Sequence, residues 1–406
     1  MLTNFNLDNF IREFVVKRGQ SLLAPDFQKN NNELKQRINH KKVLVIGGAG
    51  TIGSNYIKAI LKFNIAKLVV VDINENGLTE LVRDLRSSTE YNIPDEFITY
   101  PVNFGDRVFE KIFKAHGPFH IVANFAAHKH VRSEKDIFSI EAMIENNVLR
   151  ARKLLDLLLQ FPPEHFFCVS TDKAANPVNV MGASKKLMEE LIMAYSDRLP
   201  IKTARFANVA FSNGSLPLGF LERLAKKQPW SCPLGIRRFF VSPQESGELC
   251  LMASIMGGSG DIFFPKLDEE RDMIPFDEIA FDLLKALDLQ PDICKTEDEA
   301  KQKALQLGDN ITSYPIYFFE SDTSGEKSFE EFFTDKEDLD LDRFIHLGVI
   351  KNSKKRDILE IDEIFNRLRK LFELENVTKE AIVNIIKEYL PNFAHIETGK
   401  GLDSKM

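Results

Sequence analysis

The sequence lacks the features that mark a membrane, secreted or nucleic-acid-binding protein. None of its apolar runs reaches the ~20 residues that a membrane span needs. Polar residues interrupt the N-terminal segment too often for a secretion signal. The four cysteines show neither metal-ligand spacing nor a dense disulfide pattern, which favours reduced thiols and a cytoplasmic location. The net charge of −7 argues against a broad nucleic-acid surface, although a local group of donors can still bind an anionic small molecule.

What the sequence does contain is a regular alternation of strands and helices from Val43 onward. Short β-branched runs are separated by segments with helical apolar spacing. The predicted strands cover residues 43–46, 68–71, 97–102, 120–125, 165–169 and 201–206. Such alternation predicts an α/β fold, with a doubly wound parallel sheet covered by helices on both faces.

Other regions flank this predicted unit, which spans residues 41–208. Residues 1–40 are polar with scattered apolar positions, which predicts an N-terminal helical extension. After Asn208 the alternation breaks down and Gly and Pro become frequent, which predicts a smaller C-terminal substrate-binding lobe over residues 209–397. Further elements are expected as helices at 276–287, 358–372 and 379–389 and as a mobile tail at 398–406.

A glycine-rich segment follows the first predicted strand and opens a helix. Gly47, Gly50 and Gly53 allow a tight turn and close approach to a pyrophosphate, whose charge then lies at the helix N-terminus beside Thr51 and Ile52. At the end of the second strand, Asp72 can accept hydrogen bonds from ribose hydroxyls and would repel a 2′-phosphate. The segment therefore predicts a Rossmann-type cofactor site that takes NAD rather than NADP.

A polar group emerges where the strand at 165–169 ends. Thr171, Asp172 and Lys173 place a hydroxyl, a carboxylic acid and an amine at the edge of the sheet where ligands bind in such folds. Met181 and Lys185 follow with the four-residue spacing that puts two side chains on one helix face. Methionine cannot take a proton, so this site differs from the Tyr-x-x-x-Lys of a simple alcohol dehydrogenase.

The stretch from Ser170 to Lys185 resembles the STDKA…MGASK signature of the nucleotide-sugar 4,6-dehydratases, a branch of the extended short-chain dehydrogenase/reductase family. The resemblance implies that C4 of UDP-N-acetylglucosamine is oxidised, water is lost across C5 and C6, and the hydride returns to C6. Asp172 would protonate the leaving C6 hydroxyl, and Lys173 would be the base at C5. Thr171 would relay the C4 hydroxyl proton, and Lys185 would hold the nicotinamide ribose. Methionine at position 181 is common in this branch.

Other segments resemble further family motifs. On the cofactor side, the resemblance implies contacts from Asn103, Phe104, Ala126 and Ala127, with Asn103-Phe104 replacing a usual acidic residue near the adenine. On the substrate side it implies contacts from Lys129, His130, Arg205, Asn208, Ser215 and Arg238. His128 and His130 show no third ligand nearby, so no metal is predicted.

Two other functions remain open at this stage. A nucleotide-sugar 4-epimerase needs only hydride removal and return, although the Thr-Asp-Lys group and the missing tyrosine weigh against it. A catalytically silent NAD-binding regulator is the third possibility, and the intact acid, base and lysine weigh against that. A homo-oligomer is expected. The sequence leaves open which nucleotide sugar is bound, the stereochemistry at C5 and the downstream pathway.

Overall fold

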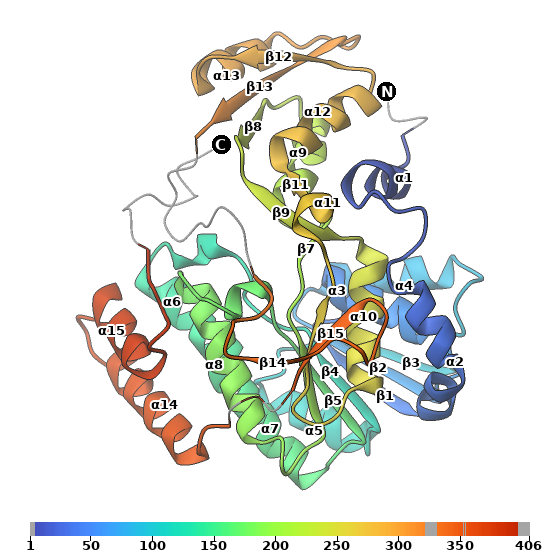
Figure 1. The fold of residues 1–406 in the computed structure, drawn as a ribbon, viewed down its shortest axis with the longest axis vertical. Coiled ribbons are helices and arrows are strands. Elements are labelled where there is room, and N and C mark those ends of the chain that lie inside the picture. The colour runs from blue at the N-terminus through green and yellow to red at the C-terminus, as the bar shows by residue number, and fades with distance from the viewer. Residues whose placement is uncertain (1–4, 321–330, 352, 354, 397–406) are drawn as a thin grey trace.

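A nine-stranded, mostly parallel sheet forms the centre of the molecule in the computed structural model, which describes residues 5–320, 331–351, 353 and 355–396 (Figure 1). The strand order is β14-β15-β10-β6-β5-β4-β1-β2-β3, with β10, β14 and β15 completing it by one parallel and two antiparallel pairings. The strands are β1 Lys42–Ile46, β2 Lys67–Asp72, β3 Glu96–Pro101, β4 Ile121–Asn124, β5 His165–Val169, β6 Ile201–Ala204, β10 Ile262–Pro265, β14 Asp338–Asp340 and β15 Leu347–Lys351.

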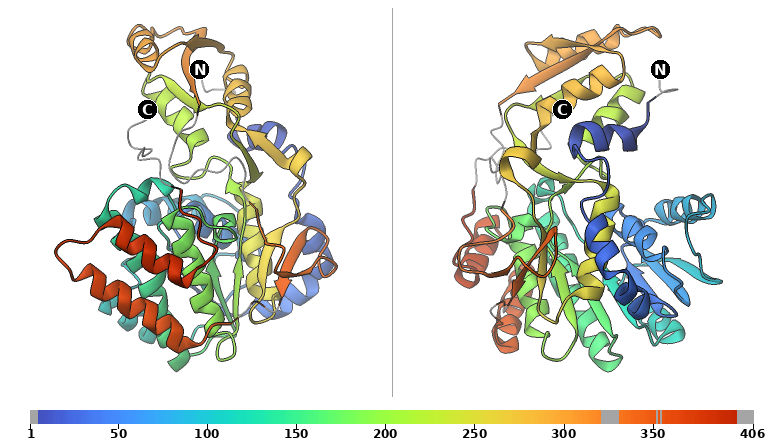
Figure 2. Two further views of the ribbon diagram at one scale, coloured as in Figure 1. Left: turned by 60° about the vertical axis from the view of Figure 1, so that its left-hand side comes forward. Right: turned by 45° about the vertical axis from the view of Figure 1, so that its right-hand side comes forward.

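Helices cover both faces of this sheet, which confirms the predicted Rossmann-type fold (Figure 2). They are α3 Thr51–Ile60, α4 Glu75–Arg86, α5 Arg107–His116, α6 Ile137–Ile144, α7 Arg150–Gln160, α8 Val180–Ala194 and α10 Pro243–Met256. Short turns precede three of them, η2 Val131–Glu134, η3 Glu145–Leu149 and η4 Asp172–Ala174. Helix α3 packs on α10, and α7 packs on α8. The strand order reverses between β1 and β4, so the crevice at their carboxyl ends is the expected ligand site.

A smaller body sits at the carboxyl ends of these strands and has its own apolar core (Figure 1). Its sheets have the orders β11-β9-β7 and β12-β13-β8. Its elements are β7 Asn208–Val209, α9 Leu216–Ala225, β8 Trp230–Pro233, β9 Arg237–Val241, α11 Glu269–Asp272, β11 Met273–Pro275, α12 Phe276–Ala286, β12 Gln290–Cys294, α13 Glu297–Leu305 and β13 Ser313–Phe319. Trp230 is buried in this core and stacks on Phe220 at 4.7 Å between ring centroids, so it contributes packing.

The chain does not stay in the smaller body after Asn208. Helix α10 and strands β10, β14 and β15 return to the central sheet. The final hairpin, α14 Ile358–Phe372 and α15 Lys379–Tyr389, packs beside α8. The predicted lobe of residues 209–397 is therefore divided between the two bodies, because the apolar strand β10 finds its parallel partner in β6. The predicted tail at 398–406 lies outside the described residues.

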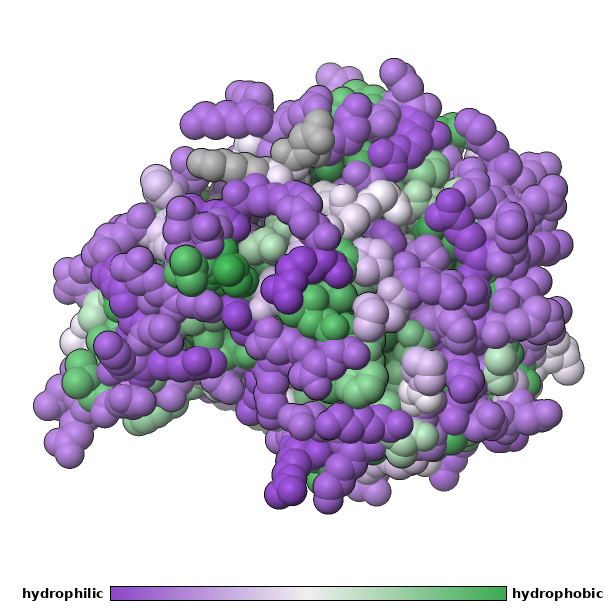
Figure 3. All heavy atoms as spheres, turned by 90° about the horizontal axis from the view of Figure 1, so that it is seen from below, coloured by the Kyte–Doolittle hydropathy of each residue, from purple (hydrophilic) through white to green (hydrophobic). Residues whose placement is uncertain are grey.

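The N-terminal segment contacts both bodies. It forms α1 Leu7–Phe10, η1 Ile11–Val15 and α2 Ala24–Ile38. The side chains of α1 and η1 join the core of the smaller body, whereas Leu34 and Ile38 of α2 join the core of the sheet. Seen from below, the surface is mainly hydrophilic with scattered apolar groups (Figure 3). No helix in the described ranges has the length and apolar character needed to cross a membrane. All four cysteines are buried and free.

Candidate active site

The turn between β1 and α3 has a shape that only glycine permits at two positions. Gly47 has a φ of +77°, and a Cβ added there would lie 2.5 Å from the Ala126 amide nitrogen. A Cβ on Gly53 would lie 2.2 Å from the Gly47 carbonyl oxygen. The backbone thus forms a cradle at the start of α3, where main-chain N–H groups and the helix dipole favour a phosphate group.

Asp72 ends β2 beside this cradle. Its Oδ2 accepts a hydrogen bond from the Ala49 amide at 2.9 Å, and its Oδ1 accepts one from the Asn74 amide at 2.9 Å. The carboxylate fixes the turn and stays partly exposed, so its remaining lone pairs can accept ribose hydroxyls. The turn and this acid together fit the pyrophosphate and ribose of a dinucleotide.

The next two strands end in turns that hold other predicted cofactor residues. After β3, the Asn103 Oδ1 accepts the Gly105 amide at 2.9 Å, and Phe104 is buried among apolar side chains. After β4, Ala126 and Ala127 continue the chain toward the crevice with half-buried side chains. Asn103 therefore shapes its turn, Phe104 packs in the core, and Ala127 lines the cavity described below.

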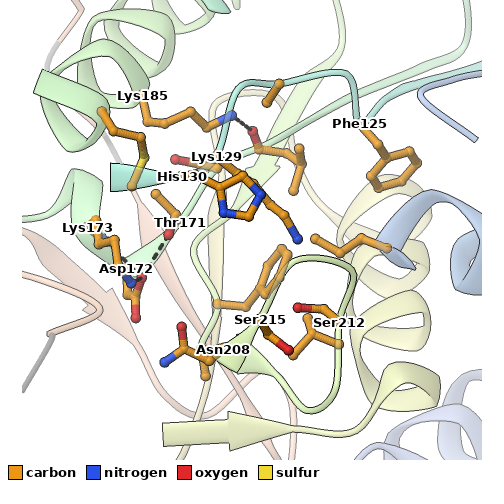
Figure 4. A pocket seen from close by; sticks show the side chains of 18 of the residues that line it. Phe125, Lys129, His130, Thr171, Asp172, Lys173, Lys185, Asn208, Ser212 and Ser215 are labelled. Atoms are coloured by element: carbon orange, nitrogen blue, oxygen red, sulfur yellow. Dashed lines mark hydrogen bonds and ion pairs between the residues drawn. The ribbon is translucent and has the colours of Figure 1, made fainter. Parts of the chain in front are cut away.

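The polar group at the end of β5 is organised around one carboxylate oxygen (Figure 4). Asp172 Oδ1 accepts hydrogen bonds from Thr171 Oγ1 at 2.7 Å and from the Lys173 amide at 2.9 Å, and it pairs with Lys173 Nζ at 3.1 Å. Asp172 is buried, whereas Thr171 and Lys173 are half-buried. A hydroxyl, an acid and an amine thus contact one another at the carboxyl edge of the sheet.

Helix α8 brings Met181 and Lys185 to the same place. Lys185 Nζ donates to the Val169 carbonyl at 2.6 Å, and burial lowers the pKa of this lysine. A Cβ on Gly182 would lie 2.6 Å from the Lys173 carbonyl oxygen, so glycine permits the close approach of helix and turn. The position of α8 and the position of the Thr-Asp-Lys turn therefore depend on each other.

Asn147 ties the loop after β4 to the same helix. It lies in the π-helical turn η3, where its Nδ2 donates to the His128 carbonyl at 2.9 Å and to Ser184 Oγ at 3.0 Å. Its Oδ1 accepts the His128 amide at 2.8 Å. This buried amide holds the loop that carries Lys129 in register with α8.

These elements enclose a cavity of about 220 Å³ between the two bodies. The predicted residues that line it are Ile52, Ala127, Lys129, His130, Thr171, Asp172, Lys173, Met181, Lys185, Asn208 and Ser215. Sequence reasoning missed walls formed by Phe125, Val169, Ser170, Phe206, Ala207, Val209, Ser212 and Gly214. Each of these lies within three residues of a predicted one. Extending each predicted motif by a few residues would therefore have included them.

Charge in the cavity is mainly positive. Lys129, Lys173 and Lys185 line it with Asp172 as the acid among the lining residues. Burial lowers the pKa of Lys129 as well as that of Lys185, since removal of water disfavours the charged form. Figure 4 shows the Thr-Asp-Lys turn on one side of the pocket and Ser212 and Ser215 on the other, with Lys129 and His130 between them. Such a cavity suits an anionic ligand with many hydroxyl groups.

Arg205 is not brought to this cavity. Its side chain is fully buried and forms paired hydrogen bonds to Glu189 at 2.9 and 2.8 Å and to Glu337 at 3.0 and 2.8 Å. Burial alone would raise the pKa of Glu189, but the Arg205 charge and hydrogen bonds outweigh it and lower that pKa to about 2. In the sequence, the acid that receives Arg205 is one of four charged residues on α8, and nothing there marks it as the partner.

Two other predicted residues, Thr51 and Arg238, do not line the cavity. Thr51 Oγ1 accepts the Asn213 amide at 3.0 Å, which joins the start of α3 to the loop of Ser212 and Ser215. Arg238 is buried on β9, where its Nη1 donates to the Arg237 carbonyl at 2.9 Å. The other residues predicted to bind the cofactor lie at or just after the carboxyl ends of β1 to β4. They are Gly47, Gly50, Gly53, Asp72, Asn103, Phe104 and Ala126. In the part of the chain that the structure describes, no three His, Cys, Asp or Glu side chains gather as metal ligands would.

The fold and the site together define a class of protein. A doubly wound sheet, a glycine cradle after its first strand and a lysine on the helix beside a polar turn are features of the extended short-chain dehydrogenases/reductases. The chain belongs to the polysaccharide biosynthesis protein family, whose model matches residues 43–350.

Similar proteins include two whose names state different reactions, a 4-epimerase and a 4,6-dehydratase. The chain is 32% identical to an uncharacterized membrane protein of Methanocaldococcus jannaschii over 57% of this chain and 68% of that protein. It is 31% identical to a UDP-glucose 4-epimerase of Rickettsia typhi, over 56% and 66%. It is 27% identical to an inverting UDP-N-acetylglucosamine 4,6-dehydratase of Campylobacter jejuni, over 56% and 68%. The probable polysaccharide biosynthesis protein EpsC of Bacillus subtilis is 29% identical over 59% of this chain, which spans only 40% of that relative.

Solved structures share the fold. The structure of Pen from Bacillus thuringiensis matches 87% of this chain and 98% of its own, with a TM-score of 0.63 and 19% identity. A UDP-glucuronic acid 4-epimerase of Bacillus cereus, crystallised with NAD and a fluorinated UDP-sugar, matches 73% of this chain and 91% of its own, with a TM-score of 0.52 and 17% identity.

Proposed function

We propose that this protein is an NAD-dependent nucleotide-sugar 4,6-dehydratase of surface polysaccharide or glycan biosynthesis, located in the cytoplasm. UDP-N-acetylglucosamine is its proposed substrate. The observation that carries the proposal is the contact of Thr171, Asp172 and Lys173 in a cavity whose helix presents Met181 and Lys185. A dehydratase needs an acid and a base besides the groups that handle C4, and this turn contains both.

The cofactor proposal rests on the cradle at Gly47 and Gly53 and on the carboxylate of Asp72. These residues would hold the pyrophosphate and the adenine ribose, and Lys185 would hold the nicotinamide ribose. Bound NAD would supply a reversible hydride acceptor for the sugar carbon. The Asp72 carboxylate disfavours a 2′-phosphate, which supports NAD over NADP.

The proton movements can be assigned to the chain's own residues. Asp172, which takes up the C4 hydroxyl proton by way of Thr171, donates a proton to the C6 hydroxyl as it leaves. Lys173 removes the proton from C5 in its neutral form, after it has lost its own proton. The ion pair between them, 3.1 Å long, lets one group respond to the charge of the other during turnover. Thr171 passes the C4 hydroxyl proton onward along its 2.7 Å hydrogen bond to Asp172. General acid–base groups of this kind typically contribute about 10²–10⁴-fold in rate.

Lys185 has a different task. Its ammonium group lies within a buried part of the site and donates to the Val169 carbonyl. The same cation would stabilise negative charge as it develops on the C4 oxygen. Met181, four residues earlier, supplies shape without taking a proton. The diphosphate of the substrate would lie near Lys129 and His130, with the sugar toward Asn208 and Ser215.

The test is to incubate purified protein with NAD⁺ and a panel of nucleotide sugars. Mass spectrometry should reveal the loss of one water from UDP-N-acetylglucosamine, and NMR should show a new C6 methyl group. Asp172→Asn should abolish this product while NAD binding stays near wild type, since the change removes the acid and leaves the proposed NAD-binding residues in place. Turnover of Asp172→Asn at the wild-type rate would contradict the assigned role.

A 4-epimerase is the second candidate, because a relative with that name is 31% identical to this chain. An epimerase would give a product of unchanged mass with the opposite configuration at C4. The same NMR spectra separate the two outcomes. Absence of turnover on every sugar in the panel would favour a silent NAD-binding regulator.

A further inference from the structure

Glu134 lies at a junction of three segments that are far apart in the sequence. It ends the turn η2, four residues after the cavity residue His130, and its side chain is only 7% exposed. Both carboxylate oxygens are engaged by partners from other elements. A buried carboxylate needs such partners, because it would otherwise be costly to remove from water.

One oxygen holds the start of the catalytic helix. Glu134 Oε2 accepts the amide of Val180, the first residue of α8, at 2.6 Å. The first N–H groups of a helix have no partner within the helix, and a negative charge there also suits the helix dipole. Glu134 therefore caps α8 from outside, in addition to the local cap that Asn179 provides.

The other oxygen is held by the C-terminal region. His395 Nε2 contacts Glu134 Oε1 at 2.5 Å, and Lys379 Nζ pairs with the same oxygen at 3.0 Å. Next to this contact, the amides of Ala394 and Ile396 donate to the carbonyls of Pro177 and Val178 at 3.1 and 3.0 Å. Residues 393–396 thus run alongside the loop that joins the Thr-Asp-Lys turn to α8. They lie beyond residue 350, where the family match ends.

A shift at this junction would be transmitted to the reacting groups. The start of α8 lies so close to the turn that a Cβ on Gly182 would be 2.6 Å from the Lys173 carbonyl oxygen. Met181 and Lys185 lie on the same helix and line the cavity. Loss of the contact from Glu134 would therefore loosen the first turn of α8. It would also change the distance between Lys185 and Lys173.

We propose that Glu134 is a positioning residue of this active site, and that residues 393–396, through His395, complete its support. The inference rests on the proposed function for its catalytic readout. Glu134 touches no reacting group. It acts through the Val180 amide, and the C-terminal segment keeps its carboxylate in place. The segment that follows the helical hairpin then supports the geometry of the site.

The experiment compares four full-length variants. Glu134→Ala removes the cap, and Glu134→Gln keeps an oxygen that can accept the Val180 amide. His395→Ala removes the C-terminal contact. Thr296→Ala is the matched control, since Thr296 Oγ1 accepts the Glu299 amide at 3.1 Å and caps α13 in the smaller body, away from the cavity. Each variant is measured for kcat and KM on the dehydration substrate, for melting temperature, and for hydrogen exchange of peptides covering residues 174–190 and 391–396.

The proposal expects a specific ranking. Glu134→Ala should lower kcat about 10–100-fold, more than it raises KM, because misplacement of reacting groups has effects of that size. Glu134→Gln should recover most of the rate, and His395→Ala should lie between them. Exchange at 174–190 should be about fivefold faster in Glu134→Ala, as expected from the loss of a helix cap. Thr296→Ala should keep kcat, even with a lower melting temperature.

Some results would overturn the proposal. If Glu134→Ala lowered kcat by less than about twofold, the loss would be too small to come from misplaced reacting groups. Unchanged exchange at 174–190 would remove the capping role. Should Glu134→Ala not fold, His395→Ala carries the test, and wild-type kcat and exchange in it would contradict the role of the C-terminal segment. If wild-type protein dehydrates no nucleotide sugar, the proposed function fails alone, because hydrogen exchange still measures the contact.

Discussion

The buried ion-pair network of Arg205 gives a prediction whose size can be worked out from the structure. Glu189 receives two hydrogen bonds from Arg205 and one from Ser170 Oγ at 2.6 Å, and its side chain is 1% exposed. Glu189→Gln keeps the shape of the side chain and removes its charge. Arg205 would then keep one carboxylate partner, Glu337, which is 18% exposed.

Two independent routes give similar magnitudes. The pKa of Glu189 falls from 4.5 to about 2 in the folded protein. At ~1.36 kcal/mol per pKa unit, a shift of this kind corresponds to about 3 kcal/mol of stability. Removing one partner of a buried ion pair typically costs about 3–5 kcal/mol. We therefore expect Glu189→Gln to lower the free energy of unfolding by about 3 kcal/mol near pH 7.

The pH dependence follows from the sign of the shift. A carboxylate whose pKa is lowered by folding contributes its full stability above its unfolded pKa of 4.5, and loses it as the pH falls toward 2. The difference between wild type and Glu189→Gln should thus be constant from pH 7 to about 5 and shrink below that. A difference that stayed constant down to pH 3 would contradict the reasoning.

Urea unfolding measures this difference directly. Circular dichroism reports on the whole chain, and Trp230, the single tryptophan, reports on the core of the smaller body. Coincident transitions would justify a two-state free energy. Glu337→Gln is the matched control, because its more exposed carboxylate should contribute only about 1 kcal/mol. A larger loss in Glu337→Gln than in Glu189→Gln would refute the assignment of Glu189 as the main partner.

Further predictions concern the glycine cradle, helix α8 and His165 at the start of β5. Gly53→Ala should lower the free energy of unfolding by about 1–3 kcal/mol through backbone overlap, whereas Gly50→Ala, whose methyl would lie 3.5 Å from the nearest atom, should leave the urea midpoint nearly unchanged. Lys185→Ala should reduce kcat by about 10²–10³-fold and Met181→Ala much less; equal losses would give the methionine a role that shape does not explain. Burial and the neighbouring Lys202 lower the pKa of His165 from 6.5 to about 4, so unfolding free energy should fall as the pH drops from 6.5 to 4, and His165→Gln should flatten that slope in urea titrations.

Helices, strands and the glycine-rich turn, which depend on local sequence, could be predicted with nearly correct residue ranges. The expected helices at 358–372 and 379–389 match α14 and α15, because a periodic apolar face both defines and ends each helix. The first predicted strands agree within a residue or two, because short apolar runs bounded by polar residues mark buried strands. The cradle at Gly47 and Gly53 was also predictable, since only glycine satisfies that backbone geometry.

Features that depend on distant partners could not be predicted in the same way. The segment at 262–265 is four apolar residues long, and its run alone does not show that it pairs with β6 of the central sheet. Arg205 lies inside a family motif, yet its partners Glu189 and Glu337 are 16 and 132 residues away in the sequence. A motif match predicts the path of the main chain. It does not predict which acidic residue a long side chain will pair with, because that depends on which residues the fold brings close.

The C-terminal hairpin shows how the two kinds of information combine. Its amphipathic pattern predicts helices with one apolar face, but not the surface that this face covers. In the structure Ile361, Ile364, Phe365 and Leu368 are buried, and α14 packs against α8. Because α8 carries Lys185, a helix pair outside the family match packs directly on an element of the candidate site. The stability of that hairpin and the geometry of the site are therefore coupled, and substitutions in either should be measured for both.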